Sequence, residues 1–256
     1  MRKIVTLVFT LITAVAYSQS PTSKRLNSGV DLGAAFKNDY LVPSITYYEM
    51  LNVDRSQLFS IGWTIKLNTF YGDNLNYTTA PAHLTRGKSG FAALSAPIKP
   101  ANIDTMRFDY VTATAVNLGL RAQIRLGPVE VGASADVLGF GFGKGRQGRY
   151  RSSTGRYEVR NTTGTADSVI TFRSNPLQSA QPQRVNVRLL GDNDLGSLST
   201  EVYVRLRLMR RLGIKAGYQW ITTAMRANNV NIEDDNQRFR NRASMAYVAV
   251  TLPFFK

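Results

Sequence analysis

Apolar and polar residues alternate along several segments of this chain, and this period of two limits its possible folds more than any other feature. Residues 201–208 show it clearly, since every second position carries a branched aliphatic side chain: Val202, Val204, Leu206 and Leu208. The positions between them hold Glu201, Tyr203, Arg205 and Arg207. Side chains of a β-strand point alternately to its two faces, so one face of this strand requires hydrocarbon and the other accepts arginine. Helical periodicity is nearly absent from the chain, which predicts an all-β protein.

The same alternation predicts eight strands, at about residues 28–36, 40–50, 58–71, 108–126, 129–142, 201–208, 214–222 and 244–255. Pro43 leaves the facing of the second strand open, because proline interrupts a strand pattern. Short turns join strands two and three, four and five, and six and seven, whereas long polar segments at about 72–107, 143–195 and 225–241 join the others. Short periplasmic turns and long extracellular loops are typical of transmembrane β-barrels. The sequence therefore predicts an eight-stranded antiparallel up-and-down transmembrane β-barrel with long extracellular loops.

The N-terminus predicts export. A basic start, Met1-Arg2-Lys3, precedes the apolar stretch Ile4–Tyr17, and Ala16-Tyr17-Ser18 fits a cleavage site before Gln19. We expect a signal peptide at residues 1–18 and one barrel domain at 19–256. No other run is long and apolar enough for a transmembrane helix, and a chain that crosses a membrane without helices must form a closed barrel.

The formal net charge of +15 and the absence of cysteine narrow the function. Such a basic balance favours nucleic acid or an anionic membrane surface as a partner, and export argues against nucleic acid. Without cysteine the chain is neither a lipoprotein nor a disulfide-stapled secreted domain.

If the apolar rows face lipid, the polar rows fill the barrel lumen, where acids and bases have to neutralise one another. The candidate lumen acids are Asp31, Asp109, Glu130, Asp136 and Glu201, and the candidate lumen bases are Lys37, Lys66, Arg121, Arg125, Arg205, Arg207 and Lys215. We expect an ion-pair network formed by Arg121, Arg125, Glu130, Asp136, Glu201, Arg205, Arg207 and Lys215. Alternation alone also fits a soluble barrel of the lipocalin type, in which the apolar rows would line a ligand cavity. Alternating connector lengths and aromatics near strand ends favour the membrane form: Phe59, Tyr71, Tyr110, Tyr218, Trp220 and Phe254.

The strand pattern, the signal sequence and the ending "AYVAVTLPFFK" together resemble the small outer-membrane β-barrel proteins of Gram-negative bacteria. The nearest type is the OmpA/OmpX-like barrel, including the PorT-like barrel family. The resemblance implies an outer-membrane location and recognition of the last strand by the barrel assembly machinery. The final Lys256 departs from the usual terminal Phe of that signal.

A barrel of eight strands has an interior that side chains fill, so we expect a structural or surface-interaction role without a pore. The alternative is an enzyme that modifies lipid A. Such catalysis needs a nucleophile with a base, and the one histidine, His83, lies in a predicted loop. No cofactor or metal is expected. The acidic run Glu233, Asp234 and Asp235 lacks EF-hand spacing and is interpreted as a loop tip.

The segment "GKGRQGRYRSSTGRYEVR" is rich in basic residues. On an outer membrane its natural anions are lipopolysaccharide phosphates, so Lys144, Arg146, Arg149 and Arg151 are candidate lipopolysaccharide-binding residues. "GRYEVRN" and "DSVITFRS" predict a further hairpin that continues two barrel strands above the membrane. Its free edge is a candidate surface for another envelope protein.

Overall fold

The computed structural model describes residues 25–153, 156–159, 168–171, 177–189, 193–209, 211–228 and 237–254. The predicted signal peptide, the acidic run at 233–235 and the last two residues of the chain lie outside the described residues. What the sequence indicates for these residues stays a prediction.

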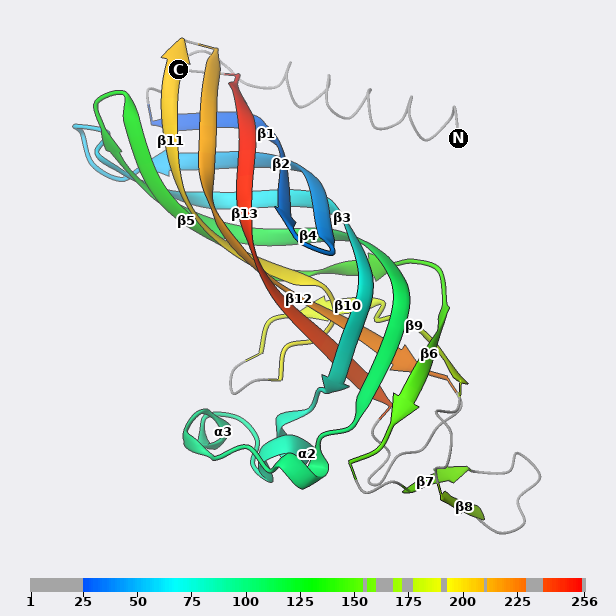
Figure 1. The fold of residues 1–256 in the computed structure, drawn as a ribbon. Coiled ribbons are helices and arrows are strands. Elements are labelled where there is room, and N and C mark those ends of the chain that lie inside the picture. The colour runs from blue at the N-terminus through cyan, green and yellow to red at the C-terminus, as the bar shows by residue number, and fades with distance from the viewer. Residues whose placement is uncertain are drawn as a thin grey trace.

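Eight strands of the described chain pair in a closed antiparallel cycle (Figure 1). Their bounds are β1 Leu26–Lys37, β2 Tyr40–Asn52, β3 Phe59–Thr79, β4 Thr105–Leu126, β5 Val129–Phe142, β11 Leu198–Met209, β12 Leu212–Ala227 and β13 Arg238–Pro253. Each strand pairs with the next in this order, and β13 returns to β1 through eight residue pairs from Gly29–Pro253 to Phe36–Ala246. Because the cycle closes, none of these strands presents a free edge along its whole length.

The sheet in the described residues nevertheless has eleven strands rather than the eight predicted. The additional strands are β6 Arg146–Arg151, β9 Leu177–Pro182 and β10 Val185–Val187, all within a segment predicted as one long loop. They were missed because they are short, and β6 carries three arginines in six residues. These strands form because they extend the sheet beside longer strands. β6 pairs with the start of β4, β9 pairs with β6 and with the end of β12, and β10 pairs with β5.

Four barrel strands continue far beyond the β1–β2 turn and form what we call the extension. It comprises residues 72–79 of β3, 105–111 of β4, 222–227 of β12 and 238–242 of β13, together with β6 and β9. Helices α2 (Ala82–Arg86) and α3 (Ala92–Ser95) and the short η1 (Pro100–Asn102) connect β3 to β4 at its far end (Figure 1). The connector from β3 to β4 and the described parts of the other long connectors at this end therefore contain regular secondary structure.

The predicted hairpin exists, with β7 (Arg156–Val159) paired to β8 (Ser168–Thr171). It forms a separate two-stranded sheet instead of continuing two barrel strands, so that part of the prediction is wrong. The barrel strands are instead continued by β6 and β9, which leave β7 and β8 to pair with each other.

Burial alternates along the strands as the period of two requires. In β11, Val202 and Val204 are 43% and 49% exposed, whereas Arg205 between Val204 and Leu206 is only 1% exposed. The apolar rows therefore face outward and the charged rows face inward. A lipocalin-like barrel requires the opposite arrangement, and the structure contradicts that alternative.

Two predicted lumen residues lie elsewhere. Lys37 is exposed because it ends β1 at the turn. Asp109 is exposed because the alternation changes phase on β3 and β4, where Asp73 and Asn74, and opposite them Asp109 and Tyr110, are exposed in succession. Asn74 takes a positive φ of 53° at this point. Beyond it, inward residues of β4 occupy even positions instead of odd ones.

Apolar side chains fill the inside of the extension. The cluster includes Phe70, Tyr77, Met106, Phe108, Tyr150, Met225 and Phe239. Tyr77 packs edge-to-face on Phe108 at 5.2 Å between ring centroids, and its hydroxyl lies 2.9 Å from Oγ1 of Thr223. The interior thus changes from ionic within the barrel to apolar within the extension.

Candidate functional site

The lumen network of the barrel is centred on Asp31, the inward carboxylate of β1. Its Oδ2 accepts a hydrogen bond from Nη2 of Arg121 at 2.9 Å and from Nζ of Lys215 at 3.1 Å. Its Oδ1 accepts one from Nη2 of Arg205 at 3.3 Å and from the hydroxyl of Thr251 at 2.7 Å. Four strands other than β1 supply these donors, so Asp31 joins elements from around the whole barrel.

Glu130 closes the network toward the short-turn end. Arg205 donates to its Oε2 at 2.9 Å, Arg125 donates to its Oε1 at 3.1 Å, and Arg207 contacts the same carboxylate. Arg125 also donates to Oε1 of Gln57 at 3.2 Å, in the turn between β2 and β3. Arg125 and Arg207 are partly exposed, so they form the mouth of the network at this end.

Glu201 extends the network toward the long-loop end. Lys215 and Lys66 donate to it at 2.5 Å and 3.1 Å, and Arg121 at 3.4 Å. Lys66 lies 4.0 Å from Asp136, whose Oδ2 accepts hydrogen bonds from the backbone amide and hydroxyl of Ser199. A continuous chain of ionic contacts therefore runs through the lumen from Arg125 to Asp136.

The most deeply buried part of the lumen network contains equal numbers of acidic and basic side chains. Among the described residues, the charged side chains that are at most 1% exposed are Asp31, Glu130, Asp136, Glu201, Lys66, Arg121, Arg205 and Lys215. Four are acids and four are bases. Pairing buried ions of opposite sign offsets part of the cost of removing them from water, and this balance provides such pairs.

Tyrosines complete the packing between these charges. The Arg121 and Arg205 guanidinium carbons each lie 4.8 Å from the ring centroid of Tyr48, and Nζ of Lys215 lies 4.0 Å from that of Tyr203. Tyr203 lies on the inward face that the strand pattern predicts, but the pattern predicts no role for either tyrosine. Asp31 and Lys66, candidates from the strand pattern, also belong to the network.

The predicted network residues thus lie together: Arg121, Arg125, Glu130, Asp136, Glu201, Arg205, Arg207 and Lys215. Side chains occupy the lumen at this level, as the inside of a small barrel requires.

An apolar belt surrounds the outside of the barrel at the same level. Its exposed aromatic residues include Phe59 and Phe254 at strand ends, and Tyr71, Tyr110, Tyr218 and Trp220 close to the level at which the extension begins. At the long-loop edge the outward residues change from apolar to polar, as from Phe36 to Lys37 and from Tyr71 to Asp73. An apolar belt bounded by aromatic residues is the lipid-facing surface of a transmembrane barrel.

Among the described residues, no helix has the length and apolar character needed to cross a membrane.

The four predicted lipopolysaccharide-binding residues do not form one cluster. Lys144 is exposed between β5 and β6, and the Arg146 guanidinium lies 5.0 Å from the ring centroid of Tyr110. Arg149 and Arg151 line a cavity of about 420 Å³ on the outer side of the extension, together with Arg107. Arg107 was missed because the predicted fourth strand begins at residue 108, which left Arg107 in the predicted loop at 72–107.

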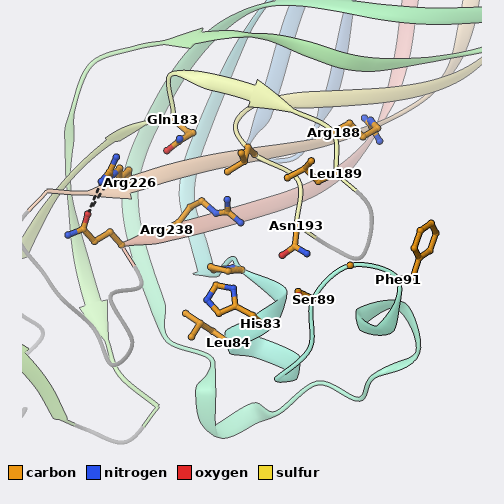
Figure 2. Close-up of a pocket in the computed structure, with 14 residues that line it drawn as sticks. His83, Leu84, Ser89, Phe91, Gln183, Arg188, Leu189, Asn193, Arg226 and Arg238 are labelled. Atoms are coloured by element: carbon orange, nitrogen blue, oxygen red, sulfur yellow. Dashed lines mark hydrogen bonds between the residues drawn. The ribbon is translucent and has the colours of Figure 1, made fainter.

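A larger cavity of about 920 Å³ lies between the α2–α3 segment and the strands of the extension (Figure 2). His83, Phe91, Arg188, Arg226 and Arg238 are among its lining residues. Arg226 donates to Oε1 of Gln237 at 3.3 Å, and Arg188 donates to the backbone carbonyls of Asp136 and Ser199. Two of the arginines are therefore already engaged by the protein.

His83 belongs to α2 and is exposed. In the part of the chain that the structure describes, no hydrogen bond joins it to Ser89, which lines the same cavity. The described residues also contain no group of three or more side chains suited to hold a metal ion.

No protein-family model matches the chain, and no curated protein matches it. Among solved structures, neisserial surface protein A has a TM-score of 0.34 at 10% identity, covering 89% of this chain and 94% of that one. The Ralstonia pickettii toluene transporter TbuX has a TM-score of 0.27 at 12% identity, covering 82% of this chain and 51% of that one. The CymD monoaromatic hydrocarbon channel has a TM-score of 0.21 at 11% identity, covering 91% and 80%. At these values, the properties of the chain have to be derived from its own residues.

The chain's own residues indicate the cellular compartment in which it lies. Burying the backbone of a membrane span requires either helices or a closed barrel. The closed cycle of strands, its apolar exterior and its ionic interior match the barrels of bacterial outer membranes. The chain is an outer-membrane β-barrel protein.

Proposed function

We propose that this protein is a filled, non-conducting and non-enzymatic barrel of eight transmembrane strands, exported after loss of residues 1–18, with an OmpA/OmpX-like architecture. Its role is structural or interactive: the barrel anchors the extension in the outer membrane, and the extension meets lipid headgroups or another envelope protein.

The observation that carries this proposal is the lumen network. Arg121 and Arg205, the largest fully buried side chains, lie across the lumen from the β1 carboxylate that binds them both. A hydrated ion passing through would have to displace charge pairs whose separation leaves uncompensated buried charges, at a cost of several kcal/mol. The apolar cluster of the extension lies beyond them and adds a second closed layer.

Planar-bilayer recording tests the proposal. Full-length protein folded into lipid and migrating as a heat-modifiable band is expected to show no sustained conductance at neutral pH. The matched variant is Arg121→Ser combined with Arg205→Ser, which removes two large lumen side chains but leaves the apolar layer in place. Conductance that appears only in this variant would assign the seal to the lumen network, and a variant that stays closed would assign it to the apolar layer of the extension.

Sustained, stepwise conductance of the natural chain would overturn the proposal. Release of acyl chains from lipid A by the purified protein, lost in a His83→Ala variant, would overturn its non-enzymatic part.

A further inference from the structure

We propose that the cavity lined by Arg107, Arg149 and Arg151 is a binding site for the phosphate group of a phosphorylated saccharide. We call it the three-arginine cavity; its other lining residues are Asn76, Ile103, Thr105, Ser152 and Ser153. The inference rests on the proposed function insofar as that function places the extension at the membrane surface.

The strand register forces the arginines together. Arg107 on β4 is the direct partner of Arg149 on β6, and Thr105 is the partner of Arg151 two residues further along. Directly opposed residues on antiparallel strands have Cβ atoms about 4.5–5.5 Å apart, and like charges in that position destabilise a sheet. A bound anion reverses the sign of this interaction.

The protein itself supplies no such anion among the described residues. No ion pair joins Arg107, Arg149 or Arg151 to a carboxylate there. Asp104, the nearest buried acid along β4, uses its Oδ1 to accept the Ser153 amide at 2.9 Å. The contrast with the lumen network is sharp, because every buried base there has a carboxylate.

The chemistry of the lining fits phosphate. Guanidinium groups form paired, charge-assisted hydrogen bonds with phosphate oxygens. The Asn76 amide, the Thr105 hydroxyl and the serine hydroxyls are neutral groups that hydrogen-bond to the hydroxyls of a sugar. A volume of about 420 Å³ lies within the range of small-molecule sites.

The height of the cavity bears on the carrier of the phosphate. Arg107 lies three residues beyond Tyr110, the belt aromatic on the same strand. At about 3.3 Å per residue and a strand tilt of about 40°, it stands about 8 Å above the belt. A phospholipid headgroup layer is about 5–8 Å thick. The cavity therefore lies at the outer surface of that layer, where the phosphate of a larger saccharide headgroup or of a soluble phosphorylated sugar can reach it.

The test measures binding to full-length protein in phosphatidylcholine nanodiscs. One arm adds lipopolysaccharide with a phosphorylated saccharide core, a second adds the same lipopolysaccharide after dephosphorylation, and two further arms add glucose 6-phosphate and inorganic phosphate. The cavity variant carries Arg107→Gln, Arg149→Gln and Arg151→Gln. The control carries Lys88→Gln, Lys99→Gln and Lys37→Gln, three exposed residues at the same end of the molecule.

The cavity variant is expected to bind phosphorylated lipopolysaccharide at least tenfold more weakly, and the control within twofold of the natural chain. Dephosphorylation is expected to remove the difference. Stronger binding of glucose 6-phosphate than of the lipopolysaccharide also supports the site and assigns its ligand to the soluble source. Equal losses in both triple variants, or no loss in the cavity variant, overturn the proposal. Conductance of the same preparations is recorded separately, so a barrel that conducts contradicts the proposed function without affecting this result.

Discussion

Asp31 on β1 and Glu201 on β11 share the same two cations, since Arg121 and Lys215 each contact both carboxylates. The two acids are far apart in the sequence, yet the closed barrel places them across one pair of bases. Each carboxylate therefore depends on the other to balance the charge of its neighbours. The pair depends on the closed barrel, because β1, β4, β11 and β12 meet across the lumen only when the cycle is complete.

Removing the charge of Asp31 tests this dependence. Asp31→Asn leaves Arg121, Arg205 and Lys215 one carboxylate short in a dry interior, and loss of one partner of a buried ion pair costs about 3–5 kcal/mol. We expect the free energy of unfolding in lipid vesicles to fall by that amount in urea titrations followed by tryptophan fluorescence. Asp109→Asn, at an exposed acid on β4, is the control and is expected to stay within about 0.5 kcal/mol of the natural chain. Equal losses in the two variants would contradict a special role for Asp31.

Much of this interior follows from the sequence, because a period of two assigns inward and outward residues wherever a strand is regular. Residues such as Asp31, Glu130 and Glu201 occupy their inward positions for this reason. Asp109 does not, because the phase change at Asn74 cannot be detected from one strand alone. Arg107 was missed for another reason, because β4 begins three residues before the predicted strand, and the three-arginine cavity was missed with it.

The three additional strands could not be predicted for a different reason. β6, β9 and β10 depend on partners that exist only once the extension has formed. Strand preference depends strongly on such context. Their buried faces hold only a few side chains, such as Tyr150 of β6 and Ala180 of β9, which is too few to establish a period of two in the sequence.

Because the apolar rows face outward, the free-energy cost of placing a charge in them should depend on its depth in the membrane. Val204→Arg places a charge at the middle of the belt and is expected to destabilise the folded barrel by about 2–4 kcal/mol. Leu26→Arg makes a similar change at the belt edge, where the cost falls to about 0–1 kcal/mol. Both residues are exposed to a similar extent, at 49% and 41%. Urea titrations in vesicles measure the two costs, and equal values would show that Val204 does not face the bilayer core.

The turn between β2 and β3 lies outside the membrane, and we expect its stability to depend on pH. Asp54 accepts hydrogen bonds from the Ser56 hydroxyl, the Phe59 amide at 2.7 Å and the Leu58 amide at 2.9 Å. These bonds, the one from Ser56 foremost, favour the carboxylate and lower the pKa of Asp54 to about 2. The folded pKa lies below the unfolded one, so this turn is stabilised above about pH 4 and loses that stabilisation as the pH falls toward 2.

Ser56→Ala is expected to raise the pKa of Asp54 toward the ordinary value for aspartate, as followed by NMR titration of its side-chain carboxyl carbon. Ser95→Ala, at an exposed serine of α3, is the control and should leave the pKa of Asp54 unchanged. A midpoint that does not move in Ser56→Ala would assign the low pKa to the backbone amides alone.

The apolar cluster predicts that the extension is a cooperative unit distinct from the barrel. Phe239 is fully buried there and packs edge-to-face on Tyr150 at 6.0 Å between ring centroids. Phe239→Ala leaves a cavity and is expected to cost about 3–5 kcal/mol. Because the lumen network is unchanged, that cost should appear as protease cleavage and faster amide exchange in the extension, while the strands of the belt stay protected. Phe91→Ala deletes the same side chain at a position that is 74% exposed and serves as the matched control. If Phe239→Ala instead unfolds barrel and extension in one transition, the two layers of the interior are a single folding unit.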